Sequence, residues 1–253
     1  MPTNVLDRLI EMLCAERGER VPQLDEGRKP LYFRALCNVR PPIAAGKEFL
    51  ALQDEYLTEQ TIRRGIVYAD GFEYEGGIAL WRGDITRLAC GATVNACNCA
   101  LLGCFVPLHG CIDNAIHSAA GVQVRLDCND MMKGGTEPNG RVRVTKAYNL
   151  PCRYIFHTVG PIVRGRVTQE NRRDLENCYL SCLEKADETG LESIAFCCIS
   201  TGEYRYPKKE ACRVAVGTVK DWKARTGSAL KVIFNVFSEE DEGIYERELG
   251  KEG

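Results

Sequence analysis

The chain has little of what membrane, exported or nucleic-acid-binding proteins carry. No apolar run approaches the roughly 18 residues that a membrane span needs. The first residues lack a basic segment followed by a clean apolar core, so we expect no signal peptide. The net charge is only −2, which gives no bulk reason to expect nucleic acid or anionic lipid as a partner. What remains is an ordinary soluble globular chain of 253 residues, enough for one sizeable domain or one domain with an extension.

Histidine is scarce, with three residues in the chain, and one of the three stands between two cysteines. Cys104, His109 and Cys111 fall within eight residues, in a loop that contains a proline. Zn²⁺ takes thiolate sulfur and imidazole nitrogen readily, and three protein ligands leave a fourth tetrahedral position for water or substrate. No paired cysteine knuckle elsewhere would close the site. The sequence therefore predicts an open zinc site, with a chance cluster of small buried cysteines as the alternative.

Cysteine, by contrast, is abundant, with fourteen residues. Most lie inside apolar runs, as Cys197 and Cys198 do, or on the apolar face of a helix, as Cys178 and Cys182 do. A free thiol in such a place packs as a small hydrophobic group. The pattern suits a reducing compartment, so we predict a cytoplasmic location. A disulfide framework is the alternative.

The chain divides into two regions of different pattern. Residues 1–70 are charged and helix-like, with apolar residues at helical spacing from Leu6 to Leu13 and again from Phe49 to Leu57. A turn-rich stretch at 22–30 and a break at Pro41–Pro42 separate them. We predict a helical N-terminal extension over 1–70 and one domain over 71–250.

From about residue 75, short apolar runs rich in β-formers alternate with helical patterns. The predicted strands are 78–81, 92–95, 154–159, 193–199 and 231–237, and the clearest helices cover 175–186 and 211–222. This alternation predicts an α/β fold with a mainly parallel sheet covered by helices on both faces. Asn139–Gly140 indicates a hairpin turn that feeds an added, antiparallel strand.

In such sheets ligands bind beyond the carboxyl ends of the strands, where several polar features fall. Asp84 follows the first strand, and it either caps a helix or accepts a hydrogen bond from an exocyclic amine such as that of adenine. The segment 200–207 places small residues and a glycine before a helix, which exposes backbone N–H groups to a phosphate. Phe237 ends the last predicted strand and either stacks on a base or packs in the core.

These features, together and in this order, resemble the macrodomain family of ADP-ribose-binding modules. They are more narrowly similar to its zinc-containing branch of protein ADP-ribose hydrolases, over about residues 78 to 240. The motifs that carry the resemblance are Gly-Asp-Ile-Thr (83–86), Asn-x-x-Asn (95–98), the Cys-to-Asp loop (104–113), Leu-Pro to Gly-Pro (150–161) and Ser-Thr-Gly to Tyr-Pro (200–207). The segment 34–42 is also similar to the extension of that branch. The resemblance implies a three-layer α/β/α sandwich with a mixed, mostly parallel sheet, preceded by the helical extension.

The resemblance also implies the residues that bind ADP-ribose. They are Asp84 and Ile85 at the adenine, Asn98, Ile112 and Asp113 near the distal ribose, Ser200, Thr201, Gly202, Glu203 and Tyr204 around the diphosphate and distal ribose, and Asn235 and Phe237 beside the adenosine. Cys104, His109 and Cys111 occupy the zinc-ligand positions. Two residues depart from the common pattern, since many macrodomains have alanine where Cys97 stands and glycine where Arg205 stands.

Charge arithmetic suggests the role of the metal. Two thiolates already neutralise Zn²⁺, so a water on this site would be less acidic than one held by three neutral histidines. We therefore expect zinc to act as a Lewis acid on a ribose hydroxyl or the scissile oxygen. Asp113 is the candidate carboxylate for orienting water or moving a proton, and Asn98 for fixing the ribose. Asp113 as a fourth zinc ligand is the alternative. His117 and His157 are predicted to be packing residues.

The sequence thus predicts a zinc-dependent hydrolase that removes mono-ADP-ribose from modified protein side chains. Ester-linked acidic residues are the expected class, because a carboxylate leaves more readily than a guanidine nitrogen. The expected partners are ADP-ribose and ADP-ribosylated protein, with neither nucleic acid nor a membrane. The rival hypotheses are a non-catalytic ADP-ribose reader, a deacylase of O-acyl-ADP-ribose and a purely structural zinc module.

Overall fold

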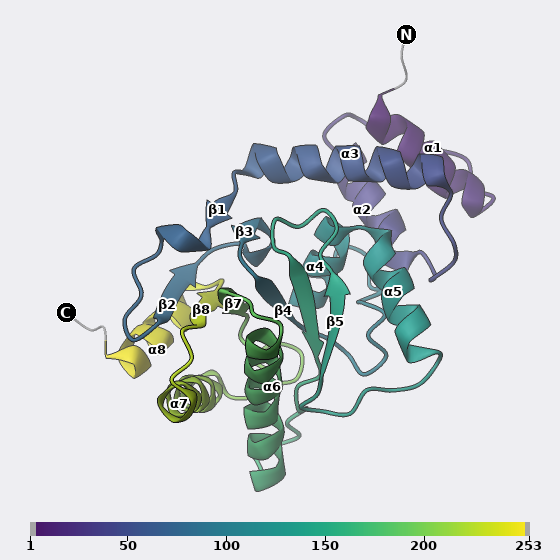
Figure 1. The fold of residues 1–253 in the computed structure, drawn as a ribbon. Coiled ribbons are helices and arrows are strands. Elements are labelled where there is room, and N and C mark those ends of the chain that lie inside the picture. Colours follow the sequence, from purple (N-terminus) through teal and green to yellow (C-terminus); the bar gives the residue numbers. More distant parts are fainter. Residues whose placement is uncertain (1–3, 251–253) are drawn as a thin grey trace.

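The computed structural model describes residues 4–250, so residues 1–3 of the predicted extension lie outside the described residues (Figure 1). The helices are α1 (Val5–Glu16), α2 (Lys29–Val39), α3 (Lys47–Arg64), α4 (Ile112–Ala120), α5 (Val122–Met132), α6 (Gln169–Glu188), α7 (Lys208–Thr226) and α8 (Glu239–Leu249). The strands are β1 (Val67–Tyr68), β2 (Ile78–Arg82), β3 (Leu88–Ala89), β4 (Ala92–Ala96), β5 (Val142–Lys146), β6 (Tyr154–Thr158), β7 (Ser193–Phe196) and β8 (Lys231–Val236).

Six strands form one sheet in the order β2-β8-β7-β4-β6-β5, and β1 pairs with β3 in a separate two-stranded ribbon. All neighbours in the large sheet are parallel except β5 and β6, which are antiparallel. The predicted antiparallel strand is therefore confirmed, and Asn139–Gly140 form a turn directly before it, but this turn is not a hairpin. Asn139–Gly140 precedes β5, whereas residues 147–153 connect β5 to its partner β6.

Alternation along the strands sends side chains to two helical layers. On one face, Tyr179 of α6 contacts Phe196 of β7, and Phe234 of β8 contacts Tyr245 of α8, with ring centroids 4.9 and 5.2 Å apart. On the other face, Asn95 of β4 points to α4. The sheet is thus covered on both sides, as Figure 1 shows with α6 and α7 in front of it. The predicted three-layer α/β fold with a mixed, mostly parallel sheet is confirmed.

The N-terminal helices α1, α2 and α3 form a further layer, at the upper right of Figure 1, with a hydrophobic core of their own. That core includes Leu9, Ile10 and Phe33, and one residue of the main domain, Val122 at the start of α5, belongs to it. The sequence analysis did not predict α2, because Pro30 lies in a stretch that reads as turns. Proline is nevertheless favoured in the first turn of a helix, and Pro30 occupies that place. The division of the chain at residue 70 stays a prediction.

All fourteen cysteines are free thiols in the structure, so the disulfide-framework alternative is not what this chain forms. Among residues 4–250, no helix combines the length and the apolar composition that crossing a membrane requires.

Candidate functional site

A cleft of about 1020 Å³ opens where the chain leaves the carboxyl ends of β2, β4, β7 and β8. Every residue that the sequence analysis assigned to substrate or metal lines it: Asp84, Ile85, Asn98, Cys104, His109, Cys111, Ile112, Asp113, Ser200, Thr201, Gly202, Glu203, Tyr204, Asn235 and Phe237. These residues come from the segments that follow β2, β4, β7 and β8, from the end of β8 itself and from the first turn of α4. Parallel strands end at the same edge of a sheet, and this brings residues more than 100 positions apart into one cavity.

The Asp84 end of the cleft is built from the ends of β2 and β8. Asp84 Oδ1 accepts hydrogen bonds from the Thr86 N–H at 3.0 Å and the Thr86 hydroxyl at 2.7 Å, so the capping interpretation is confirmed. Its second oxygen accepts a hydrogen bond from Arg64 of α3 at 3.1 Å. Asn235 donates to the Gly83 carbonyl at 3.0 Å and ties β8 to the same turn. Phe237 is 80% exposed, so the core-packing alternative for this ring is wrong.

The segment 197–206 leaves β7 as a tight turn along the cleft. The N–H groups of Arg205 and Tyr206 donate to the carbonyls of Gly202 and Ser200 within the turn. Ser200 and Arg205 have φ angles of 65° and 56°, in the left-handed region that favours glycine. Arg205 therefore keeps the backbone conformation expected of the glycine that many macrodomains have there. Cys97, the other departure, is buried and donates its thiol to the Thr158 carbonyl at 3.3 Å.

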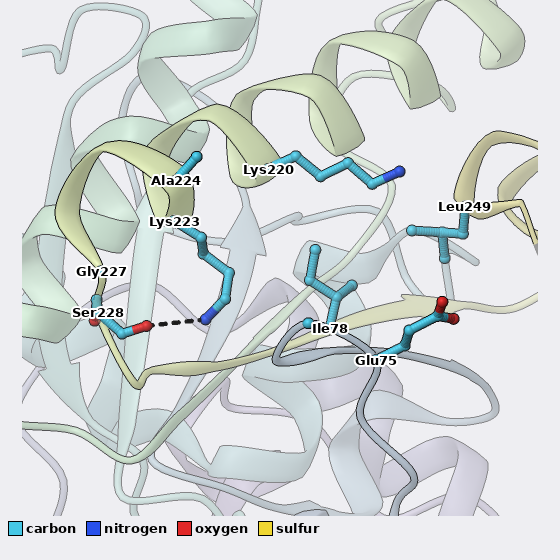
Figure 2. Close-up of a pocket in the computed structure, with 9 residues that line it drawn as sticks. Glu75, Ile78, Lys220, Lys223, Ala224, Gly227, Ser228 and Leu249 are labelled. Carbon is cyan, nitrogen blue, oxygen red and sulfur yellow. Dashed lines mark hydrogen bonds between the residues drawn. The ribbon is translucent and has the colours of Figure 1, made fainter.

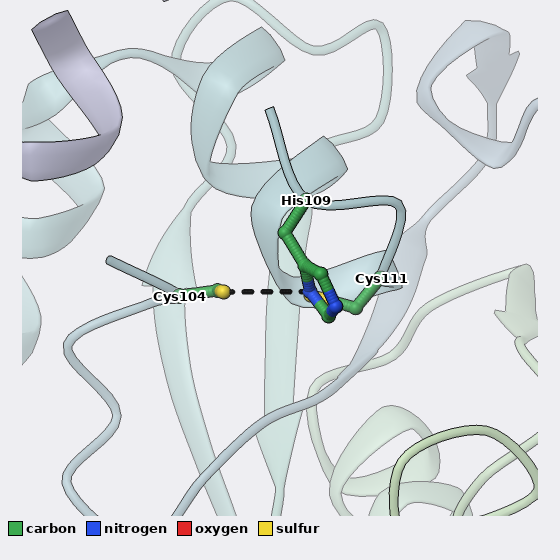
Figure 3. A group of neighbouring side chains, drawn as sticks. All are labelled: Cys104, His109 and Cys111. Atoms are coloured by element: carbon green, nitrogen blue, oxygen red, sulfur yellow. Dashed lines mark hydrogen bonds between the residues drawn. The ribbon is translucent and has the colours of Figure 1, made fainter. Parts of the chain in front are cut away.

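The metal candidates point toward one another (Figure 3). One donor atom from each of Cys104, His109 and Cys111 lies within 4.8 Å of the other two, and Cys104 Sγ is 3.6 Å from His109 Nδ1. Two donors of a tetrahedral zinc, each about 2.0–2.3 Å from the ion, are roughly 3.5 Å apart. The other ring nitrogen, Nε2, lies 3.4 Å from a Glu203 carboxylate oxygen. A carboxylate on the far nitrogen is the usual support of a metal-ligating histidine.

Cys111 lies at the N-terminus of α4, where its sulfur accepts a hydrogen bond from the Asn114 N–H at 3.4 Å. The positive end of a helix stabilises a thiolate. Burial, however, raises the pKa of the Cys111 thiol to about 11. A thiolate in this place therefore calls for a nearby cation, and the soft donor set Cys₂His suits zinc. The three residues fit the metal that the sequence predicted.

Asp113 is 5% exposed and faces the cleft from the first turn of α4. Its carboxylate accepts hydrogen bonds from the side-chain amides of Asn95, at 2.8 Å, and Asn98, at 3.5 Å. Burial raises its pKa to about 6, while the Asn95 hydrogen bond opposes the shift. Within the described residues the metal-donor group comprises Cys104, His109 and Cys111, without Asp113. This arrangement favours Asp113 as a carboxylate beside the metal site over its alternative role as a fourth ligand.

The remaining histidines are buried behind Asp113. His157 receives the Asn95 amide at 3.2 Å on Nδ1 and lies 2.9 Å from the Thr145 hydroxyl on Nε2, and burial lowers its pKa to about 3. Burial also lowers the pKa of His117 far below its usual value. The His117 ring nitrogens have no hydrogen-bond partner within residues 4–250, although Nε2 lies 3.5 Å from Asp113. Both are packing residues, as predicted, and both are neutral.

The sequence analysis gave no site role to several residues of the cleft wall, among them Arg34, Phe105, Gly160 and Lys208. Arg34 comes from α2 in the N-terminal extension, whose similarity to known extensions was noticed but given no role. Lys208 forms ion pairs with Glu240 and Asp241 of α8, which offset its positive charge at the cleft wall.

A second cavity of about 520 Å³ lies at the C-terminal end of α7 (Figure 2). Its main polar contacts are internal, because Lys223 donates to the carbonyls of Ser228 and Leu230 at 3.1 and 2.7 Å. Lysine at this place satisfies carbonyl groups that follow the helix, which is a structural role. The cavity contains none of the predicted site residues.

Comparison with known proteins gives consistent results. The family model described as the Macro domain matches residues 94–215. A protein-ADP-ribose hydrolase of Treponema medium is 47% identical over 94% of this chain and 95% of that protein, and one of Staphylococcus aureus is 43% identical over 98% of this chain and 96% of that protein. The solved structure of a Trypanosoma brucei macrodomain in complex with ADP-ribose aligns with a TM-score of 0.67 at 29% identity, covering 90% of this chain and 97% of that one.

Proposed function

The chain belongs to the macrodomain family, and on this premise we propose that it is a zinc-dependent hydrolase that removes mono-ADP-ribose from modified protein side chains. Its relatives are named for hydrolysis of protein-linked ADP-ribose, which supports a hydrolase of ADP-ribose linkages over a reader. The observation that carries the proposal is the single cleft. It joins a nucleotide-sized groove to three converging metal donors and a buried carboxylate.

The residues of the cleft would contact different parts of ADP-ribose according to their position. Ser200, Thr201 and Gly202 offer small side chains to the diphosphate, and the turn that they begin offers backbone N–H groups. The exposed ring of Phe237 is free to stack on the adenine. Asp84 has one oxygen committed to Thr86 and the other shared with Arg64, which leaves that second oxygen able to accept a further bond from the adenine amine.

Asp113 would orient the attacking water and accept its proton, since Asn95 fixes the direction of its carboxylate. Asn98, next to Asp113 in the cleft, would position the distal ribose. Zinc, held by Cys104, His109 and Cys111, would supply a Lewis acid at the sugar end of the cleft. Glu203 then has two tasks, because it supports the His109 ring and borders the diphosphate turn.

We propose ester-linked aspartate and glutamate as the substrate class. A carboxylate is a better leaving group than the guanidine nitrogen of an arginine linkage, so it needs less assistance from the enzyme. Fourteen free cysteines and a donor set that requires thiolates accord with the cytoplasmic location that we propose.

The test measures zinc content and single-turnover release of ADP-ribose from ester-modified protein on one sample, before and after chelation. We expect about one zinc per chain and release that chelation abolishes. Cys104→Ala should remove both zinc and release, whereas Asp113→Ala should retain zinc and slow release by at least a hundredfold.

Binding of ADP-ribose without any release would identify a reader, and faster turnover of O-acyl-ADP-ribose than of modified protein would identify a deacylase. Melting of the domain on chelation, instead of the loss of release alone, would identify a structural zinc.

A further inference from the structure

The metal loop, residues 104–111, has no regular secondary structure, yet it must hold its ligands to within fractions of an ångström. Three of its residues, Phe105, Val106 and Leu108, are exposed apolar side chains that cannot anchor it in the core. Its conformation therefore depends on hydrogen bonds to its backbone. Several of the partners come from the N-terminal helix α2.

Asn38 of α2 makes the first of these contacts. Its Oδ1 accepts a hydrogen bond from the Leu108 N–H at 2.9 Å, and its Nδ2 donates to the Ser118 hydroxyl of α4 at 2.9 Å. Leu108 has a φ angle of 56°, a left-handed conformation that side-chain-bearing residues rarely adopt, and it directly precedes the ligand His109. Asn38 is 2% exposed and is not part of the cleft wall, so it acts from behind the loop.

Arg34, one turn earlier on α2, makes the second contact. Its guanidinium donates to the Asn114 side-chain oxygen at 2.7 and 3.2 Å and to the His109 carbonyl at 3.4 Å. Asn114 in turn donates its side-chain amide to the Val106 carbonyl at 3.0 Å and its backbone N–H to Cys111 Sγ at 3.4 Å. Through Asn114, Arg34 therefore reaches both the middle of the loop and its last ligand.

We propose that Arg34 and Asn38 are positioning residues for the metal loop, so that the N-terminal extension completes the metal site of the main domain. The inference rests on the proposed zinc site and adds to it the source of its rigidity. α2 lies some 65–75 positions before the ligands in the chain, and its side chains do not touch the metal donors themselves.

The test is the zinc affinity of the full chain, measured by competition with a chromophoric chelator, a readout that does not depend on turnover. Loss of a residue that holds metal ligands in place weakens metal binding by roughly 10- to 100-fold. We expect Asn38→Ala to raise the zinc dissociation constant about tenfold, within that range. Arg34→Gln should have a similar effect, but Arg34 also lines the cleft, so Asn38 is the cleaner position.

The matched control is Arg8→Gln, which removes an arginine of the same extension whose partner, Glu48, lies on α3. This variant should bind zinc as the wild type does. Circular dichroism of each metal-free variant at the working temperature shows whether it is folded.

A second variant separates positioning from general packing. Glycine adopts a φ of 56° at little cost, so Leu108→Gly removes the strain that Asn38 restrains. In the Leu108→Gly background, Asn38→Ala should therefore weaken zinc binding less than in the wild type, by about threefold instead of tenfold.

The outcomes are distinguishable. A wild-type chain that binds no zinc would overturn the proposed metal site and this inference together. A wild type that binds zinc while Asn38→Ala and Arg34→Gln bind it equally well would overturn only the role of α2. An equal loss in both backgrounds would show that Asn38 acts through packing, which also overturns the positioning role.

Discussion

Gly160 shows at the scale of one residue how closely the cleft is packed. A Cβ atom at this position would lie 2.1 Å from Ser200 Oγ and 2.8 Å from Ile199 Cγ2, distances that no real contact tolerates. Ser200 is 7% exposed, so its hydroxyl has little open space into which it can move aside. The glycine is therefore required by its neighbour and not by its own backbone, since its φ angle is an ordinary one.

We expect Gly160→Ala to displace the turn at Ser200 and to weaken ADP-ribose binding at least tenfold, while zinc content stays unchanged. Isothermal titration with ADP-ribose and metal analysis on the same preparation measure the two quantities. Gly217→Ala is the control, because a Cβ at this position in α7 meets no atom within 4 Å and Gly217 does not line the cleft. Equal affinities of the Gly160→Ala variant and the wild type would contradict the proposed place of the diphosphate.

At the scale of elements, α5 is the helix that joins the extension to the cleft. Its Arg125 donates to the carbonyls of Leu102, Cys37 and Arg40 at 2.5–2.9 Å, and the guanidinium lies 4.3 Å from the centroid of the Phe105 ring. One buried side chain thereby connects the C-terminal end of α2 with the segment that enters the metal loop. The sequence analysis did not predict α5, because its buried face includes Gln123 and Arg125 and so lacks apolar periodicity.

Arg125→Met should lower the free energy of unfolding by about 3 kcal/mol, because three carbonyl groups lose their partner in a buried place. Urea unfolding followed by circular dichroism measures this loss. Arg153→Met is the control, since Arg153 is an exposed arginine that also lies over an aromatic ring, Tyr154. A loss below about 1 kcal/mol for Arg125→Met would mean that the carbonyls find other partners.

At the scale of the whole molecule, the buried histidines set the response of stability to acid. The pKa of His157 is lowered to about 3 and that of His117 lies far below its ordinary value. An unfolded chain binds protons on both near pH 6.5, whereas the folded chain does not, so stability falls as the pH drops below about 6.5. Asp113 opposes this, since a pKa raised to about 6 makes the folded chain the stronger proton binder between pH 4 and 6.

Replacing one of these histidines should reduce the loss of stability that the protein shows as the pH falls below about 6.5. His157→Gln removes one group that must stay neutral, while glutamine can still meet Thr145 and Asn95. Its free energy of unfolding should fall less than that of the wild type between pH 6.5 and 4.5, and the two slopes should differ by up to about 1.4 kcal/mol per pH unit. Urea unfolding of both proteins across this pH range measures the difference. Parallel pH profiles for the two proteins would show that His157 is protonated in the folded state.

Much of this molecule could be foreseen from local pattern. Each predicted apolar run begins where a strand begins and ends within three residues of the strand's end, and the periodic segments at 175–186 and 211–222 lie within α6 and α7. The metal candidates could be named from the Cys-His-Cys spacing, and the other site residues because their motifs resemble those of the macrodomain family. Helices α2, α5 and α8 escaped prediction because their buried faces are short or polar, with only Ile244 and Tyr245 buried in α8.

The sequence by itself determined the chemistry of this protein: which side chains can bind a soft metal, cradle a phosphate and present a carboxylate. These properties belong to residue types and short spacings, so they are legible along the chain. Only the tertiary structure decided which distant groups meet. Glu203 lies beside the His109 ring, Arg64 donates a hydrogen bond to Asp84, and α2 packs behind the metal loop. Such contacts depend on how the layers pack against one another in three dimensions, so no local sequence pattern predicts them.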